Sequence, residues 1–331
     1  MLKLNYIINR INFFILITKY ILSIKEPNNC MKIYNIDEKT KVPTFKIGNN
    51  IILDKQIGLI SKHGIIYIAH FKTNIEYKFA VKITSQSNNN KIEIEILNKL
   101  TKIVFQLKCP HFPITYGILT CNDYYLLDDN KYLFPKLIKN NKNLYIQINE
   151  LAEGDLHTNL ISKENKDNLN SLTQILFSIM FFYYYIGVYH CDPHPGNFLY
   201  HKIKPGGYFH YNIYGKDYYL ENKGYLWVIW DFGLTQPFTN KNISINYDYD
   251  YLLTRIKLYN TIENYNIFDS NTINIILMLF NNIIKKYDNI YNIKLLKNMN
   301  KEILNYLIKY IPSLTTTKPS NIINKTPYVI K

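Results

Sequence analysis

The residues best suited to chemistry gather in two short segments in the second half of the chain. Residues 190–197 read HCDPHPGN, which places Asp192 and Asn197 five positions apart in a loop after a helical stretch. Residues 230–233 read WDFG and put Asp231 at the end of a β-rich run. A carboxylate can accept a proton from a hydroxyl group, and carboxylate and amide oxygens are the hard donors that Mg²⁺ prefers. The two segments therefore allow proton abstraction beside a bound Mg²⁺ ion.

A lysine and a glutamate in the first half of the chain could hold phosphate groups. Lys82 ends the strand-like run FAVK, and Glu93 lies in the helical stretch that follows it. A lysine binds phosphate oxygens as a compact charge, and a carboxylate can keep that lysine in place. Glu95 competes with Glu93 for this role, but helical phase favours Glu93 because Leu97 follows it by four residues.

The order of these segments resembles that of the protein-kinase family. An HxDxxxxN loop followed by a strand and DFG is the signature of that family, and a strand lysine and a helical glutamate precede it in the expected order. The resemblance covers roughly residues 50–255. It implies an α+β fold of two lobes, a small β-rich N-lobe and a compact helical C-lobe, with ATP and Mg²⁺ bound between them.

The resemblance implies a role for each of the motif residues. Lys82 would hold the α- and β-phosphates of ATP, and Glu93 would position Lys82. Asp192 would be the catalytic base, while Asn197 and Asp231 would bind Mg²⁺.

The resemblance implies further site residues, although the motifs around them match the family pattern less regularly. His194 stands where serine/threonine kinases usually carry a lysine near the γ-phosphate, and Glu150 and Leu151 resemble the nucleotide-binding hinge. Gly58 and Gly64 stand in place of the glycine-rich loop, but they are six residues apart and the pattern is degraded.

Other departures concern the second half of the chain. Cys191 replaces the arginine that usually binds an activation-loop phosphate, so we expect activity that is independent of such phosphorylation. No Ala-Pro-Glu follows Gly233, and Asp250 is expected to brace the catalytic loop from a helix start. The loop itself resembles that of ABC1/UbiB-type kinases, although kinases of large DNA viruses are the closest in style.

The surrounding pattern predicts the elements that must position these residues. Strand-like runs lie at 51–53, 64–69, 79–83, 124–127 and 144–148, and helical patterns at 91–102, 169–186 and within 250–311. We expect an N-terminal extension at 1–44, an N-lobe at 45–149 and a C-lobe at 150–311. Residues 201–225 are expected to be an insertion or extended hairpin, and residues 312–331 a loose tail.

The first 24 residues contain an apolar run that is interrupted by Lys19 and is shorter than a membrane span. We expect a helix that packs on the domain or lies on a membrane surface. Translation from Met31 would omit the segment, and a true membrane anchor is the remaining alternative.

Composition limits the other possibilities. The formal net charge is +14, but only two of the 39 basic residues are arginines, Arg10 and Arg255, which argues against specific nucleic-acid binding. Four cysteines without a CxxC pair exclude a disulfide scaffold and indicate a reducing compartment. The prolines around His190, Cys191 and His194 argue against a zinc site in that loop.

We therefore expect an ATP-dependent serine/threonine protein kinase that acts on a protein hydroxyl, in the cytoplasm of a host cell or in a virion. A kinase of a small molecule is one alternative, since Ala-Pro-Glu is missing. A pseudokinase that serves as a binding scaffold is another, but Lys82, Asp192, Asn197 and Asp231 are all retained.

Overall fold

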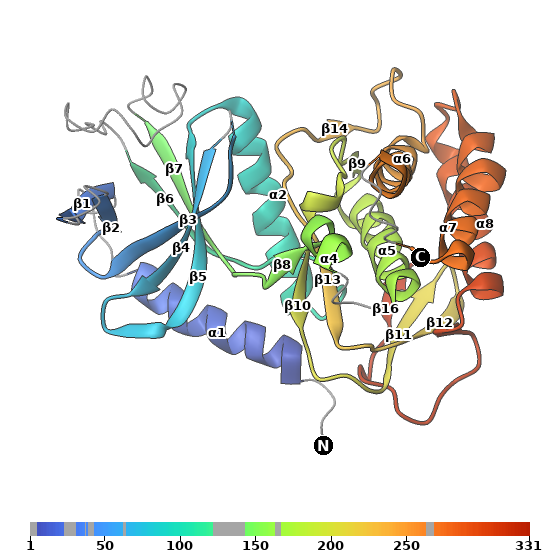
Figure 1. Ribbon diagram of the computed structural model, residues 1–331, viewed down its shortest axis with the longest axis horizontal. Helices are drawn as coiled ribbons and strands as arrows, with labels where there is room; N and C mark the ends of the chain where they lie inside the picture. The colour runs from blue at the N-terminus through green and yellow to red at the C-terminus, as the bar shows by residue number, and fades with distance from the viewer. Residues whose placement is uncertain are drawn as a thin grey trace. The chain divides into compact units, whose positions relative to one another are not determined.

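The computed structural model describes residues 5–22, 31–36, 38, 43–61, 64–121, 143–162, 167–262 and 268–331, and these form a mixed α+β structure. The N-terminal region is rich in β-strands and the C-terminal part is largely helical (Figure 1). The chain divides into two units. The N-terminal unit contains Ile8–Thr101 and Pro113–Leu151, and the C-terminal unit contains Met1–Ile7, Lys102–Phe112 and Ala152–Lys331.

Seven antiparallel strands form the sheet of the N-terminal unit, in the order β1-β2-β3-β4-β5-β7-β6. They are β1 (Met31–Ile36), β2 (Pro43–Ile47), β3 (Ile51–Ser61), β4 (Gly64–Phe71), β5 (Asn74–Ser85), β6 (Thr115–Cys121) and β7 (Leu144–Asn149). The β-branched residues that predicted strands supply the core, since Val81, Ile83, Ile146 and Ile148 are fully buried. The strand expected at 124–127 lies outside the described residues.

The helix α2 (Asn88–Phe105) follows β5 and is longer than the expected 91–102. It begins where the Ser87 hydroxyl accepts a hydrogen bond from the backbone N–H of Asn90. Ile96, Leu97 and Leu100 are buried on one face, as their helical spacing predicts.

The apolar N-terminal segment forms the helix α1 (Asn5–Ile21), which belongs to the N-terminal unit from Ile8 onward. Ile17 and Ile21 are buried, and the Phe13 ring makes edge contacts with Tyr77 of β5 and Tyr116 of β6. The Thr18 hydroxyl donates to the carbonyl of Tyr116. Residues 31–47 also join the sheet as β1 and β2, so most of the described part of the expected extension is integrated with this unit.

One described cysteine forms a disulfide bond, although a reducing compartment was expected to keep the cysteines as free thiols. Cys109 and Cys191 are free thiols, whereas Cys121 at the end of β6 is disulfide-bonded. The described cysteines thus include two free thiols and one that is disulfide-bonded.

A buried helix organises the C-terminal unit. α5 (Asn168–Ile186) begins at Asp167, whose carboxylate accepts from the Asn170 N–H, and ends at Gly187, where φ is +77°. Among the described residues α5 is the one helix long and apolar enough to cross a membrane, but 78% of its apolar window is buried inside the protein. Burial on all sides is what a central helix of a folded domain requires.

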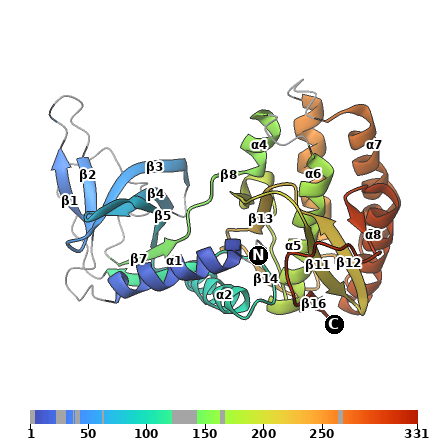
Figure 2. The same ribbon diagram turned by 90° about the horizontal axis from the view of Figure 1, so that it is seen from below.

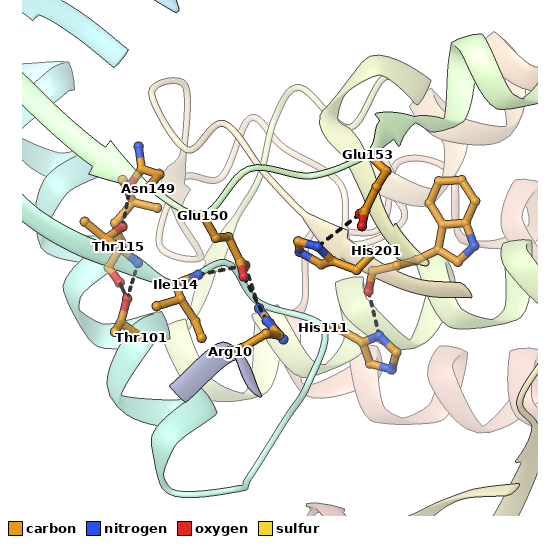
Figure 3. A network of polar contacts seen from close by, with 11 residues as sticks. Arg10, Thr101, His111, Ile114, Thr115, Asn149, Glu150, Glu153 and His201 are labelled. Carbon is orange, nitrogen blue, oxygen red and sulfur yellow. Dashed lines mark hydrogen bonds and ion pairs between the residues drawn. The ribbon is translucent and has the colours of Figure 1, made fainter. Parts of the chain in front are cut away.

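Short strands and a short helix also belong to this unit. β8 (Gly154–Asp155), β10 (Phe198–Lys202) and β13 (Tyr225–Ile229) form a three-stranded sheet in the order β13-β10-β8. β9 (Val188–Tyr189) pairs with β14 (Gln236–Pro237), and α4 (Leu156–Ser162) follows β8. His111 joins Lys102–Phe112 to this unit. Its Nδ1 donates to the Trp227 carbonyl (Figure 3), and its Nε2 accepts from the Tyr211 hydroxyl.

Residues 312–331 are not a loose tail, which corrects the expectation from their Thr- and Pro-rich composition. β15 (Leu314–Thr315) and β16 (Tyr328–Ile330) flank the hairpin of β11 (Tyr208–Ile213) and β12 (Lys216–Glu221), in the order β15-β12-β11-β16. Tyr328 and Ile330 are almost fully buried. Figure 2 shows this sheet beside α5, where Phe177 contacts the ring of Tyr211. The two edges of the hairpin in the expected insertion are thus paired with strands from the end of the chain.

Three further helices complete the C-terminal unit and agree with the helical pattern of residues 250–311. They are α6 (Tyr247–Ile262), α7 (Ser270–Leu279) and α8 (Leu296–Tyr310). Leu252, Leu253 and Ile256 of α6 are buried, and so are Ile303, Leu304 and Leu307 of α8.

Candidate functional site

Lys82 and Glu93 form a buried ion pair in the N-terminal unit. The Nζ of Lys82 on β5 lies 2.6 Å from the Oε1 of Glu93 on α2, and both residues are buried. Gln147, opposite Lys82 on β7, directs its amide towards the Oε2 of Glu93 at 3.5 Å. Glu95, the competing acid, is exposed. A lysine that is fixed in this way can offer its charge to an anionic ligand without first having to be ordered.

The two glycines of the degraded loop lie at the β3–β4 turn. Gly58 is in β3, where the pairing with β4 is irregular between Ile57 and Ser61, and Gly64 begins β4. A Cβ at Gly64 would lie 2.6 Å from the carbonyl oxygen of Ile83 on β5. The strand contact alone therefore requires glycine at position 64.

Glu150 has a side-chain partner that its sequence context did not predict. Its carboxylate oxygens accept two hydrogen bonds from Arg10 of α1, from Nε at 2.8 Å and from Nη2 at 2.6 Å (Figure 3). Its Oε1 also accepts from the backbone N–H of Ile114 at 2.9 Å. Glu150 and Leu151 follow β7 directly. Since the Glu150 carboxylate is already bound, any contact of this segment with a nucleotide must use other groups.

The loop at 190–197 is held by its own backbone and side chains. The Asn197 amide Nδ2 donates to the carbonyl of Asp192 at 2.8 Å and lies 3.4 Å from the carboxylate Oδ2 of Asp192. Because Nδ2 makes these contacts, the amide oxygen of Asn197 points elsewhere and remains a possible metal ligand. His194 Nδ1 accepts from the Gly196 N–H and thereby starts the short 3₁₀-helix η1 (Pro195–Asn197). Its Nε2 lies 3.8 Å from Asp192 Oδ2.

Asp231 stands at the same end of the β10–β13 pair as Asn197. Phe198 pairs with Ile229, and the next hydrogen bond joins the Trp230 N–H to the Asn197 carbonyl at 2.8 Å. Asp231 has a φ of +63°, a left-handed conformation that is uncommon for residues other than glycine. Such conformations persist where the surroundings enforce them, and they concentrate at functional sites.

His190 connects the loop to the segment that carries Asp231. Its Nε2 donates to the Trp230 carbonyl at 2.8 Å, and its Nδ1 accepts from the Asp192 N–H at 3.3 Å. The buried Phe232 ring stacks on Phe182 of α5 and makes an edge contact with His190. These contacts fix the backbone on both sides of Asp231 and Asp192.

Asp248, rather than the expected Asp250, braces the loop. Asp248 Oδ2 accepts from the His190 N–H at 2.6 Å and from the Tyr183 hydroxyl at 2.8 Å, while Oδ1 accepts from the Cys191 N–H at 2.8 Å. Burial raises the pKa of the Asp248 carboxyl, although His190 and these donors favour its ionised form. Asp250 instead faces Lys285 at 2.7 Å.

Cys191 is a poor nucleophile in this environment. Burial raises the pKa of its thiol to about 12, and the Asp248 carboxylate adds to the shift. Since the thiolate is the reactive form of cysteine, the thiol is inert near neutral pH. Its φ of +66° lets the Asp248 carboxylate receive two successive N–H groups, so Cys191 contributes through its backbone.

The residues present suit Mg²⁺ together with a phosphate ligand better than a protein-only metal centre. No group of three or more His, Cys, Asp or Glu side chains that could hold a metal ion exists in the described part of the chain. Asn197 and Asp231 supply oxygen donors from adjacent backbone segments. Mg²⁺ commonly takes one or two protein oxygens and completes its shell with phosphates and water.

Sequence reasoning missed several residues around this site. Tyr251 of α6 directs its hydroxyl to Asp192 Oδ1 at 3.4 Å, and Arg255 follows it by one helical turn. No sequence motif predicted that Tyr183 and Asp248 hold the loop, or that Arg10 binds Glu150 in the N-terminal unit. The sequence offers one signal for the arginines, since Arg10 and Arg255 are the two arginines of a lysine-rich chain.

Comparison with known proteins finds two viral relatives. The chain is 28% identical over 146 residues to "Putative serine/threonine-protein kinase 019R" of Frog virus 3 (isolate Goorha), which covers 44% of this chain. It is 27% identical over 197 residues, or 56% of this chain, to "Probable serine/threonine-protein kinase 380R" of Invertebrate iridescent virus 6. No family model matches the chain.

The relatives support a kinase-like chain and no more than that. The matches cover 16% and 36% of the relatives' own lengths, so the chain corresponds to a minor part of each. Neither relative's name supports a likeness to ABC1/UbiB-type kinases, which the loop sequence suggested.

Proposed function

We propose that this chain is an ATP-dependent phosphotransferase with a protein-kinase-like fold, which transfers the γ-phosphoryl group of ATP to serine or threonine hydroxyls of proteins. The observation that carries the proposal is the braced loop of the C-terminal unit. The Asn197 amide fixes Asp192 in this loop through the hydrogen bonds that it donates to it, and Asp231 follows the strand beside the loop. The names of the two viral relatives agree with this class of reaction.

The chemistry assigns one task to each group. The Asp192 carboxylate accepts the proton of the acceptor hydroxyl, whose oxygen forms a bond to the γ-phosphorus while the bond to the β,γ-bridging oxygen breaks and ADP leaves. Mg²⁺, bound with ATP through the Asn197 amide oxygen and Asp231, would neutralise phosphate charge.

The N-terminal unit carries a fixed cation suited to phosphate. Lys82, kept in place by Glu93, holds phosphate oxygens. His194 offers an imidazole beside Asp192 in the loop. From the viral relatives we further propose that the chain acts in host cytoplasm or in the virion.

A transfer assay tests the proposal. The purified chain is incubated with γ-labelled ATP, Mg²⁺ and one basic and one acidic protein, alongside the Asp231→Asn variant. We expect label on serine or threonine that falls at least about 10²-fold in the variant, the scale of a single electrostatic catalytic group. Equal labelling by the wild-type chain and by the Asp231→Asn variant would contradict the proposal. Transfer to small alcohols alone would favour a small-molecule kinase, and absence of Mg²⁺-dependent ATP binding would favour a scaffold.

A further inference from the structure

Two residues on the first turns of α6 extend the environment of Asp192 to the protein surface. The Tyr251 hydroxyl donates to Asp192 Oδ1 at 3.4 Å, and Arg255 Nη2 donates to the oxygen of the same hydroxyl at 3.2 Å. The guanidinium carbon also lies 5.1 Å from the centre of the Tyr251 ring. Asp192, Tyr251 and Arg255 thus form a continuous chain of polar contacts that ends at an exposed cation.

The Arg255 guanidinium is oriented but not neutralised. Its hydrogen bond and its stacking contact are both with Tyr251, and no carboxylate lies within ion-pair distance of it in the described parts of the chain. One edge of the guanidinium is engaged, so its other N–H groups face solvent. A guanidinium ordered in this way loses less side-chain freedom when it binds an anion.

The choice of arginine at this position is informative in this chain. Lysine is the usual basic residue here, and only Arg10 and Arg255 depart from it. Arg10 uses its planar fork to bind both oxygens of Glu150. A two-point contact with a carboxylate is what arginine offers and lysine does not. Arg255 has the same capacity and no carboxylate of its own among the described residues.

We propose that Arg255, oriented by Tyr251, binds a carboxylate of the acceptor, so that the preferred acceptor hydroxyl has an aspartate or glutamate beside it. This inference rests on the proposed function of Asp192 as the base. The Tyr251 hydroxyl oxygen lies 3.4 Å from Asp192 Oδ1 and 3.2 Å from Arg255 Nη2, so it links the two groups over a short span. An extended peptide advances about 3.3–3.6 Å per residue, so the acidic residue lies about one or two positions from the acceptor.

The charge of Arg255 would help an acidic acceptor to approach Asp192. An acidic acceptor would be repelled by the Asp192 carboxylate, and the positive charge of Arg255 offsets that repulsion on the side where the two are joined by Tyr251. Tyr251 is a positioning residue in this account, because its hydroxyl touches both groups.

Peptides with a single serine test the inference. Three versions carry aspartate, asparagine or lysine at the positions that flank the serine, and transfer from γ-labelled ATP is measured for each. We expect the wild-type KM to be about five- to tenfold lower for the aspartate peptide than for the asparagine peptide, with a similar kcat. Arg255→Glu should remove or reverse this preference, and Arg255→Lys should keep part of it.

Two controls separate specificity from folding and from net charge. Lys257→Glu places the same charge reversal on an exposed residue of α6 and should retain the preference. Tyr251→Phe should weaken the preference and also lower kcat, since it loosens both Arg255 and Asp192. A wild-type enzyme with equal KM for all three peptides, or a preference that survives in Arg255→Glu, would overturn the inference.

A binding measurement keeps the result distinct from a failure of the proposed function. Fluorescence anisotropy of the three labelled peptides is measured with wild-type protein and with Arg255→Glu. If no peptide or protein is phosphorylated, the proposed function fails. Tighter binding of the aspartate peptide by wild type alone then still supports the role of Arg255, and equal binding by the two proteins overturns it.

Discussion

Arg10 and Glu150 form a two-point ion pair that joins α1 to the end of β7. The hydrogen bonds measure 2.8 and 2.6 Å, and the two side chains are only 9% and 5% exposed (Figure 3). Glu150 also accepts the Ile114 N–H, so three donors surround its carboxylate. The N-terminal helix is therefore part of the N-terminal unit in an energetic sense, because its removal would leave a buried charge without a partner.

Arg10→Ala should destabilise the protein strongly. Breaking a buried ion pair from one side typically costs about 3–5 kcal/mol, because the remaining charge stays buried and unpaired. We expect a loss near the lower end of that range in the free energy of unfolding, measured by urea denaturation. Adding Glu150→Gln should recover part of it. Lys19→Ala, at an exposed basic residue of the same helix, is the control. An Arg10→Ala protein as stable as this control would refute the pairing.

Glu93→Gln should reduce phosphoryl transfer by at least about tenfold, because Lys82 loses the charge that holds it. The matched control is Glu95→Gln, which changes an exposed acid two residues along the same helix. Initial rates with γ-labelled ATP measure both. Similar rates in the two variants would show that the Lys82–Glu93 pair has no part in the reaction.

Asp248→Asn should damage the loop that carries Asp192. An amide can accept at one oxygen only, so at least one of the donors on His190, Cys191 and Tyr183 loses its acceptor. A buried donor without a partner costs about 1–3 kcal/mol, and we expect that loss of stability together with a lower kcat. Asp250→Asn, which removes the contact with Lys285, serves as the comparison. Thermal unfolding and transfer rates of the two variants decide the matter, and equal effects would contradict the assignment of Asp248.

Cys191 should react slowly with iodoacetamide in the folded protein. Its pKa is raised from 9.0 to about 12, so the folded state keeps the proton at pH values where the unfolded chain loses it. Protonation of this thiol therefore favours folding below pH 9, and this contribution is lost as pH rises from 9 to 12.

Peptide mass spectrometry after labelling at pH 8.5, with and without urea, measures this difference. We expect strong labelling of Cys191 only in urea. Rapid labelling of the native protein at this pH would mean that the thiol is neither buried nor held neutral.

Local patterns predicted the elements that carry the site, and they failed where long-range contacts decide. The choice of Glu93 over Glu95 followed from helical phase, and the structure pairs Glu93 with Lys82. Asp248 and Asp250 are also two positions apart, but at the start of α6 the sequence shows no helical spacing that would distinguish them. Burial against His190 and Cys191 selects Asp248, and the sequence does not encode that contact locally.

The ends of the chain illustrate the same limit. Arg10 and Glu150 are 140 positions apart, and no motif joins them. Residues 328–330 form a strand because β11 offers an edge that an apolar Tyr328 and Ile330 can cover, although their neighbours have the composition of a loop. Tertiary context overrides local propensity in such short strands.

The most direct test of the account is the rate of phosphoryl transfer by Asp192→Asn. The asparagine keeps the size of the side chain but cannot accept a hydroxyl proton as a carboxylate does. We predict a fall in kcat of about 10²–10⁴-fold with γ-labelled ATP and a protein acceptor, the usual contribution of a general base. Asp217→Asn, at a partly exposed acid of β12, should transfer at the wild-type rate. Equal activity of Asp192→Asn and wild type would contradict the central claim.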